Sequence, residues 1–136
     1  MNILDIFDSI KTTLTKIPEI KQVFFEGDEA QSVESVGNFV VLCDDGEERV
    51  FCGNYIKRRF FASIKFVVYN PALANKNKME TIISLSEKIE IELNNSILVK
   101  IIDNFYCTGI EPCAVFDGEN EYGEGRILKF IFEKGE

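Results

Sequence analysis

The first residues to consider for metal or nucleophilic chemistry are the four cysteines, Cys43, Cys52, Cys107 and Cys113. No two of them form a CxxC pair and the chain has no histidine, so the closely spaced ligands of a structural zinc site are missing. Without histidine, a Ser-His-Asp or Cys-His site has no base to activate its nucleophile. The commonest general base near neutral pH is also missing. We therefore expect the cysteines to be small buried hydrophobic residues. We expect no metal, no cofactor and no enzymatic activity.

A basic cluster, Lys57-Arg58-Arg59, interrupts a chain whose net charge is -8. The plain interpretation is a solvated strand end, because exposed charges contribute little to stability. The functional interpretation is a contact with DNA or with acids of a neighbouring subunit. Those acids would come from the acidic, glycine-rich segment 117–125, which contains Glu119, Glu121 and Glu124. We expect this segment to be a hairpin loop and not a calcium loop, because Tyr122 stands where a calcium loop needs glycine.

Length and composition predict one domain over residues 1–136, with 46% hydrophobic residues. The acidic balance argues against a surface that binds duplex DNA. No apolar run approaches the length that spans a membrane. The amino-terminal residues are acidic where a signal peptide would be basic. We therefore expect a protein of the reducing cytoplasm, or of an assembly made there.

The segment from Tyr55 to Tyr69 is predicted to be a long central antiparallel strand, ended by Asn70-Pro71. At a period of two, one face is wholly apolar from Phe60 to Val68 and should meet the core. The other face mixes aromatic, polar and charged side chains. Phe61 lies on this second face, where core burial, contact with a helix layer and a subunit interface are the alternatives.

The amino-terminal half predicts a helix over residues 2–17, with Asn2 as its N-cap and Pro18 ending it. A short strand over 22–26 and a polar loop over 27–35 follow. A strand over 39–43, buried on both faces, a turn at 44–46, a partner strand over 49–52 and a turn at 53–54 would then form a meander.

The carboxyl-terminal half predicts a second amphipathic helix over about 77–95. Its expected apolar arc consists of Met79, Ile82, Ile83, Leu85, Ile89 and Leu93. Ile91 falls outside that arc, either as an ordinary exposed residue or as a subunit contact. Residues 97–102 fit either a helix or a strand. Residues 105–116 are predicted to form a bulged or edge strand, and residues 126–132 are predicted to form the closing strand. The element order predicts an α+β fold, with a mostly antiparallel sheet of about five strands and two amphipathic helices packed on it.

This arrangement resembles the tail terminator, or tail-completion, proteins of tailed bacteriophages and phage-tail-like particles, some of which are labelled minor capsid proteins. The resemblance covers nearly the whole chain in element order. It is sharpest from the basic-then-aromatic strand YIKRRFFASIKFVVYNP to the acidic and apolar helix METIISLSEKIEIEL.

The resemblance implies a structural protein without catalytic activity. Such proteins form hexameric rings that cap the tail tube in the host cytoplasm, end its polymerisation and offer a surface to the head-side connector protein. The partners implied are therefore further copies of the chain, the tube protein and the connector, with no membrane. An acidic lumen would let DNA pass without specific binding. Alternatives are another head–tail connector or tail-assembly protein, and a small acidic cytosolic binding module. The candidate interface residues are Lys57, Arg58, Arg59, Phe61, Ile91, Glu119, Glu121 and Glu124.

Overall fold

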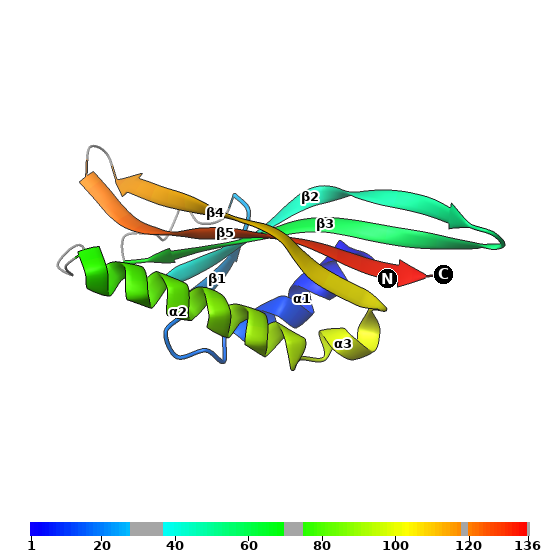
Figure 1. The fold of residues 1–136 in the computed structure, drawn as a ribbon, viewed down its shortest axis with the longest axis horizontal. Coiled ribbons are helices and arrows are strands. Elements are labelled where there is room, and N and C mark those ends of the chain that lie inside the picture. The colour runs from blue at the N-terminus through cyan, green and yellow to red at the C-terminus, as the bar shows by residue number, and fades with distance from the viewer. Residues whose placement is uncertain (28–36, 70–74, 118–119, 136) are drawn as a thin grey trace.

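The fold is α+β, with a five-stranded sheet in the order β1-β2-β3-β5-β4 and helices on one side of it (Figure 1). The structure, a computed structural model, describes residues 1–27, 37–69, 75–117 and 120–135. The helices are α1 (Ile3–Leu14), α2 (Asn75–Asn94) and α3 (Leu98–Ile101). The strands are β1 (Gln22–Phe25), β2 (Phe39–Cys52), β3 (Tyr55–Val68), β4 (Asn104–Asp117) and β5 (Asn120–Gly135). The predicted α+β class and mostly antiparallel sheet are confirmed.

Helix α1 begins where the sequence predicts it. The Asn2 side chain accepts hydrogen bonds from the backbone N–H groups of Leu4 and Asp5, at 2.9 and 3.2 Å. The Asp5 carboxylate accepts one in return from the Asn2 N–H, at 2.8 Å, which completes a capping box. The helix ends at Leu14, short of Pro18, because the chain tightens into turns over the next residues. Residues 97–102, which fitted either structure, contain the short helix α3.

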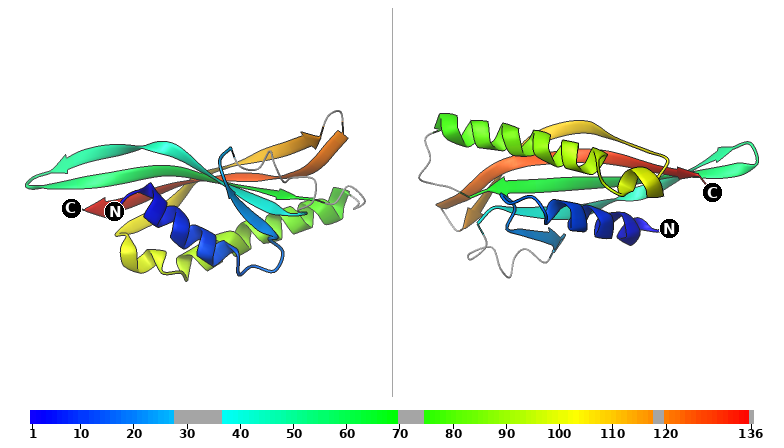
Figure 2. Two further views of the ribbon diagram at one scale, coloured as in Figure 1. Left: turned by 180° about the vertical axis from the view of Figure 1, so that it is seen from behind. Right: turned by 90° about the horizontal axis from the view of Figure 1, so that it is seen from below.

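The helix-covered face of the sheet carries the main core. Phe60, Ala62, Ile64, Phe66 and Val68 of β3 are all buried there, as the period of two predicted. They meet the buried residues Leu128, Phe130 and Phe132 of β5 and the inward stripes of α1 and α2. Figure 2 shows both of these helices lying along the same side of the sheet.

The opposite face carries no helix among the described residues (Figure 2). A smaller buried cluster covers one end of it, made of Phe24, Phe39, Val41, Val67 and Tyr122. The Tyr122 hydroxyl accepts a hydrogen bond from the Gly37 N–H at 3.1 Å and donates one to the Gly37 carbonyl at 3.0 Å. This end of β2 is buried on both faces, as the sequence predicted.

Strand β1, for which the sequence predicted no partner, pairs with β2 in parallel, which requires a crossover instead of a tight turn. The predicted meander over residues 39–54 is wrong in one respect. Residues 39–52 form one strand, since the 44–46 segment makes a bulge within β2 and not a turn. The Asp44 carboxylate accepts a hydrogen bond from the Gly46 N–H at 3.0 Å, and Gly46 has a φ of 111°. The turn residues thus bend the strand without ending it.

Strand β5 begins before the predicted boundary, because residues 120–125 pair with β4 instead of forming a loop. Gly123 and Gly125 explain this difference. A Cβ atom at Gly123 would collide with the carbonyl oxygen of Val68 on β3, and one at Gly125 would collide with that of Phe66. The glycines therefore allow the close approach of two strands. On α2, Met79 and Ile83 are exposed despite their place in the predicted apolar arc, because the buried stripe is narrower.

Candidate assembly interface

The β2–β3 hairpin extends beyond the end of the rest of the sheet (Figure 1). Among the described strands, β1 pairs with β2 only as far as Leu42, and β5 pairs with β3 only as far as Lys57. We call residues 46–61 the arm. Beyond Lys57 the end of the arm, residues 51–56, is a pair of strands without a third neighbour. Such a pair is only marginally stable in water, so this end depends on support at the root of the arm.

The tip of the arm is apolar and exposed. The predicted turn at Gly53-Asn54 is a two-residue hairpin loop. Gly53 has a φ of 67°, and the first residue of such a loop needs a positive φ. Phe51 is 79% exposed and Tyr55 is 50% exposed. Cross-strand pairing places Phe51 beside Ile56, and Tyr55 beside Cys52 on the other side of the hairpin. The sequence predicted the strand around Phe51 but not its projection away from the core.

Arg58 holds the helix side of the arm's root. Its Nε lies 2.6 Å from Oε1 of Glu47 on the facing strand, and its guanidinium lies 4.7 Å from the centre of the Phe60 ring. Its Nη1 also donates to the carbonyl oxygen of Met1, which precedes α1. The hydrogen bond from Arg58 holds the pKa of the Glu47 carboxyl below its ordinary value.

Glu133 holds the other side of the root. It is only 3% exposed, and its Oε2 lies 2.8 Å from Nε of Arg59 and 3.3 Å from Nζ of Lys57. Asn104 of β4 donates to Oε1 at 3.3 Å. Desolvation by burial acts to raise the pKa of Glu133, but the hydrogen bonds from Arg59, Lys57 and Asn104 outweigh it. The net pKa therefore lies below the ordinary carboxyl value.

The predicted basic cluster thus has carboxylate partners within its own chain. Sequence reasoning missed Glu133 because it is far from the cluster in the sequence and meets it only through the β3–β5 register. Of the predicted acidic partners, Glu119 and the side chain of Glu121 lie outside the described residues. Glu124 lies opposite Val68, at the other end of β3 from Lys57. At about 3.3 Å per residue, these ends are roughly 35 Å apart.

Glu124 borders a groove between α2 and β4. The groove has a volume of about 370 Å³ and is lined by Lys78, Met79, Ile82, Pro112, Cys113, Glu124, Gly125 and Arg126. Nζ of Lys78 lies 3.6 Å from Oε1 of Glu124. Met79, at the edge of the groove, is 61% exposed. Burial raises the pKa of the Cys113 thiol, so this cysteine is a poor nucleophile at neutral pH.

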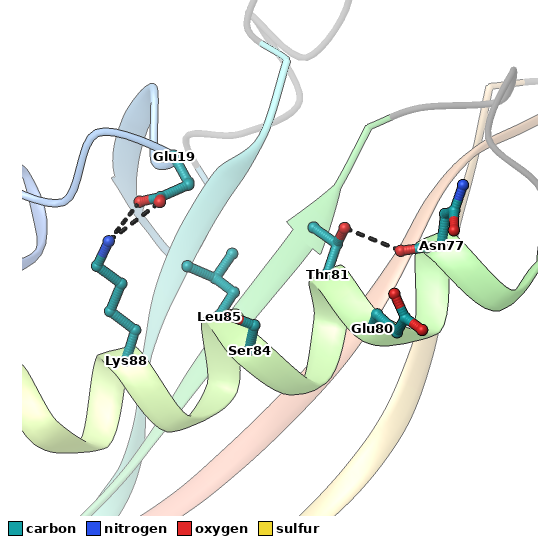
Figure 3. A pocket seen from close by; sticks show the side chains of 7 residues that line it. All are labelled: Glu19, Asn77, Glu80, Thr81, Ser84, Leu85 and Lys88. Atoms are coloured by element: carbon teal, nitrogen blue, oxygen red, sulfur yellow. Dashed lines mark hydrogen bonds and ion pairs between the residues drawn. The ribbon is translucent and has the colours of Figure 1, made fainter.

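A second pocket, of about 480 Å³, is polar and lies on the other flank of α2 (Figure 3). Its lining residues are Glu19, Asn77, Glu80, Thr81, Ser84, Leu85 and Lys88. Lys88 Nζ contacts both Glu19 oxygens, at 3.0 and 3.2 Å, and thereby ties α2 to the segment after α1. The Thr81 hydroxyl donates to the Asn77 carbonyl at 2.9 Å, inside its own helix. The Thr81 hydroxyl and the Lys88–Glu19 pair are thus engaged in contacts within the fold.

The remaining predicted interface residues lie on two different surfaces. Ile91 is 57% exposed and points away from the core side of α2. Phe61 is half-buried on the helix-free face, opposite Ile131 of β5. Phe61 therefore belongs neither to the helix layer nor to the closed core. Phe61 lies two residues beyond Arg59 on the same face of β3, next to the basic cluster, whereas Ile91 lies on α2.

The cysteines are all free and half-buried, so the expected full burial is wrong in degree. Within the described residues, no group of three His, Cys, Asp or Glu side chains is placed to hold a metal ion.

Comparison with known proteins assigns no family: no family model matches the chain, and no curated protein matches its sequence significantly. None of the helices in the described ranges has both the length and the apolar character needed to cross a membrane.

Proposed function

We propose that this protein is a structural subunit that terminates the tail tube of a phage or phage-tail-like particle. In this proposal, copies of the chain close into a ring, most simply a hexamer, at the head-proximal end of the tail. The ring stops addition of tube protein and presents a surface to the head-side connector. Assembly takes place in the cytoplasm of the bacterial host.

The observation that carries the proposal is the arm, with its exposed apolar tip and its anchored root. None of the residues 46–59 of the hairpin is buried, so this part adds little to the core of its own subunit, yet Arg58 and Glu133 hold its root with several charged contacts. An exposed element anchored at its root is suited to reach a neighbouring molecule, because the anchoring reduces the conformational freedom lost when it binds.

The distribution of surface features also supports a ring. The arm lies at one end of the elongated sheet (Figure 1). The groove is lined by the start of α2 and by the adjoining parts of β4 and β5, which lie toward the other end. Two different surfaces at opposite ends favour a head-to-tail contact, and such contacts close into rings when the rotation per subunit allows it. The net charge of -8 gives DNA no general attraction to the ring, so DNA can pass through it.

Electron microscopy of particles assembled with and without this protein tests the proposal. We expect a six-fold ring that contains the protein at the head-proximal end of the tube. Without the protein, we expect tubes of irregular and excessive length. Tubes of normal length and an unchanged end would refute the terminator function. A label found on the connector side, away from the tube, would instead support another head–tail connector.

A further inference from the structure

We infer that the tip of the arm docks in the α2–β4 groove of a second copy of this chain. This contact rests on the self-association proposed above and specifies the two surfaces that meet. The aromatic side chain of Phe51 would enter the groove, and Tyr55 would cover its edge.

The tip provides an aromatic anchor that its own subunit leaves in water. Single exposed hydrophobic residues are ordinary on protein surfaces. Here Phe51 and Tyr55 gather at the end of a projecting strand pair, together with the half-buried Ile56. Aromatic anchors that fill a pocket on the partner carry much of the affinity of protein interfaces. The anchoring of the arm by Glu133 holds the tip in place before the partner arrives.

The groove has the size and lining that such an anchor needs. Its volume of about 370 Å³ accommodates an aromatic side chain, and Met79, Ile82 and Pro112 supply apolar contacts. Met79 is unbranched and can adjust to the shape of an entering ring, and its sulfur interacts favourably with aromatic groups. Helix α2 leaves Met79 largely exposed although it lies on the flank next to the groove. A docked aromatic ring would cover it.

The charges beside the two surfaces are complementary. The groove is bordered by two cations, Lys78 and Arg126, and by the carboxylate of Glu124. Just behind the tip, the arm exposes Glu48 and Arg49. When the tip enters the groove, Glu48 can approach Arg126 and Arg49 can approach Glu124. Complementary charges at the rim of an interface fix its register more than they add to its affinity.

A subunit cannot fill its own groove, because the tip of the arm lies beyond Lys57 at one end of β3 and the groove residue Glu124 lies opposite Val68 at the other end. A contact of one end with the other leaves a free arm and a free groove after each step. It therefore continues until a ring closes or a chain of subunits grows.

The cysteines at the two surfaces allow a direct test with the full chain. Cys52 lies in the tip and Cys113 lines the groove. Unlabelled and nitrogen-15-labelled protein are mixed at high concentration and treated with a short bismaleimide. Cross-linked peptides are then identified by mass spectrometry, and those that carry both isotope labels join different copies. We expect mixed-isotope peptides that join Cys52 to Cys113. Because burial raises the pKa of Cys113, a Met79→Cys variant provides an exposed thiol beside the same groove.

Phe51→Ala tests the anchor. Loss of an anchor of this kind weakens an interface by roughly thirtyfold, so the cross-link yield, compared over a dilution series that reaches concentrations below the dissociation constant, should fall by a similar factor there. Ile97→Ala, at an exposed position before α3, is the matched control and should leave the yield unchanged. Far-ultraviolet circular dichroism verifies that both variants are folded.

Absence of mixed-isotope links from Cys52 to both Cys113 and the Met79→Cys thiol would overturn the inference. An undiminished yield with Phe51→Ala would also overturn it. The outcome is separate from that of the proposed function. If the cross-links form but removal of the protein does not change tail length, the contact between copies stands and the tail function is refuted. If the protein caps tails but the cross-links do not form, the tail function stands and this contact is refuted.

Discussion

Replacement of Glu133 by Gln tests whether the ionic contacts at the root of the arm stabilise the fold. The substitution keeps the size of the side chain and an oxygen for Asn104, but it removes the charge that faces Arg59 and Lys57. Because Glu133 is almost fully buried, we expect the free energy of unfolding to fall by about 1–3 kcal/mol. The value lies below that for a fully buried pair, because both cations remain partly in water and can be hydrated.

Urea denaturation of the wild-type protein and of Glu133→Gln measures this difference at several pH values. The ordinary pKa of a glutamate is 4.5 here, and the pKa of Glu133 in the folded protein lies lower. A carboxyl with a lowered folded pKa stabilises the fold fully above its unfolded pKa and loses that effect as the pH falls through the folded value. The difference between the two proteins should therefore be constant near neutral pH and shrink below about pH 4.5.

The matched control is Glu111→Gln, which removes the exposed ion pair that Glu111 forms with Lys129, at 2.8 Å. An exposed pair contributes little, so we expect no measurable change in the free energy of unfolding. If Glu133→Gln behaves like this control, or if its effect persists unchanged at pH 3, the contacts at the root do not stabilise the fold in the way described.

Gly125→Ala should cost about 3 kcal/mol or more, because the added Cβ meets the carbonyl oxygen of a neighbouring strand. Gly109→Ala, where nothing lies within 4 Å of the added atom, is its control, and equal midpoints in thermal unfolding would contradict the steric argument. Tyr122→Phe should lose about 1–2 kcal/mol, since the buried hydroxyl contacts both polar groups of the Gly37 backbone. Stability equal to that of the wild type in urea would refute this. Cys113 should react with a maleimide more slowly at pH 8 in the folded protein than in urea, because burial raises the pKa of its thiol, and equal rates would show that it is not protected.

Local periodicity was sufficient to predict much of the fold. The apolar face of β3 from Phe60 to Val68 followed from alternation alone, because side chains in a strand point to opposite faces in turn. The start of α1 followed from Asn2, whose side chain satisfies N–H groups that the helix leaves unpaired. The α+β class followed from the order of such elements.

Pairing between distant segments was beyond these local rules. Asp44 and Gly46 favour a turn, and only the antiparallel register with β3 reveals that they form a bulge inside one long strand. The parallel pairing of β1 with β2 depends in the same way on tertiary contacts that a linear pattern does not specify. For the same reason, the sequence identified the basic cluster but not Glu133 as its partner.

The strand order places β5 between β3 and β4, although β5 comes after both along the chain. During synthesis, β3 and β4 are therefore complete while the strand that joins them is still missing. A chain that stops before residue 120 leaves one edge of β3 and one edge of β4 without their partner, and uncovers the main core. Exposed strand edges and apolar surface favour aggregation. Stable folding of this sheet should therefore wait until β5 has left the ribosome, and fragments that lack it should accumulate as insoluble protein.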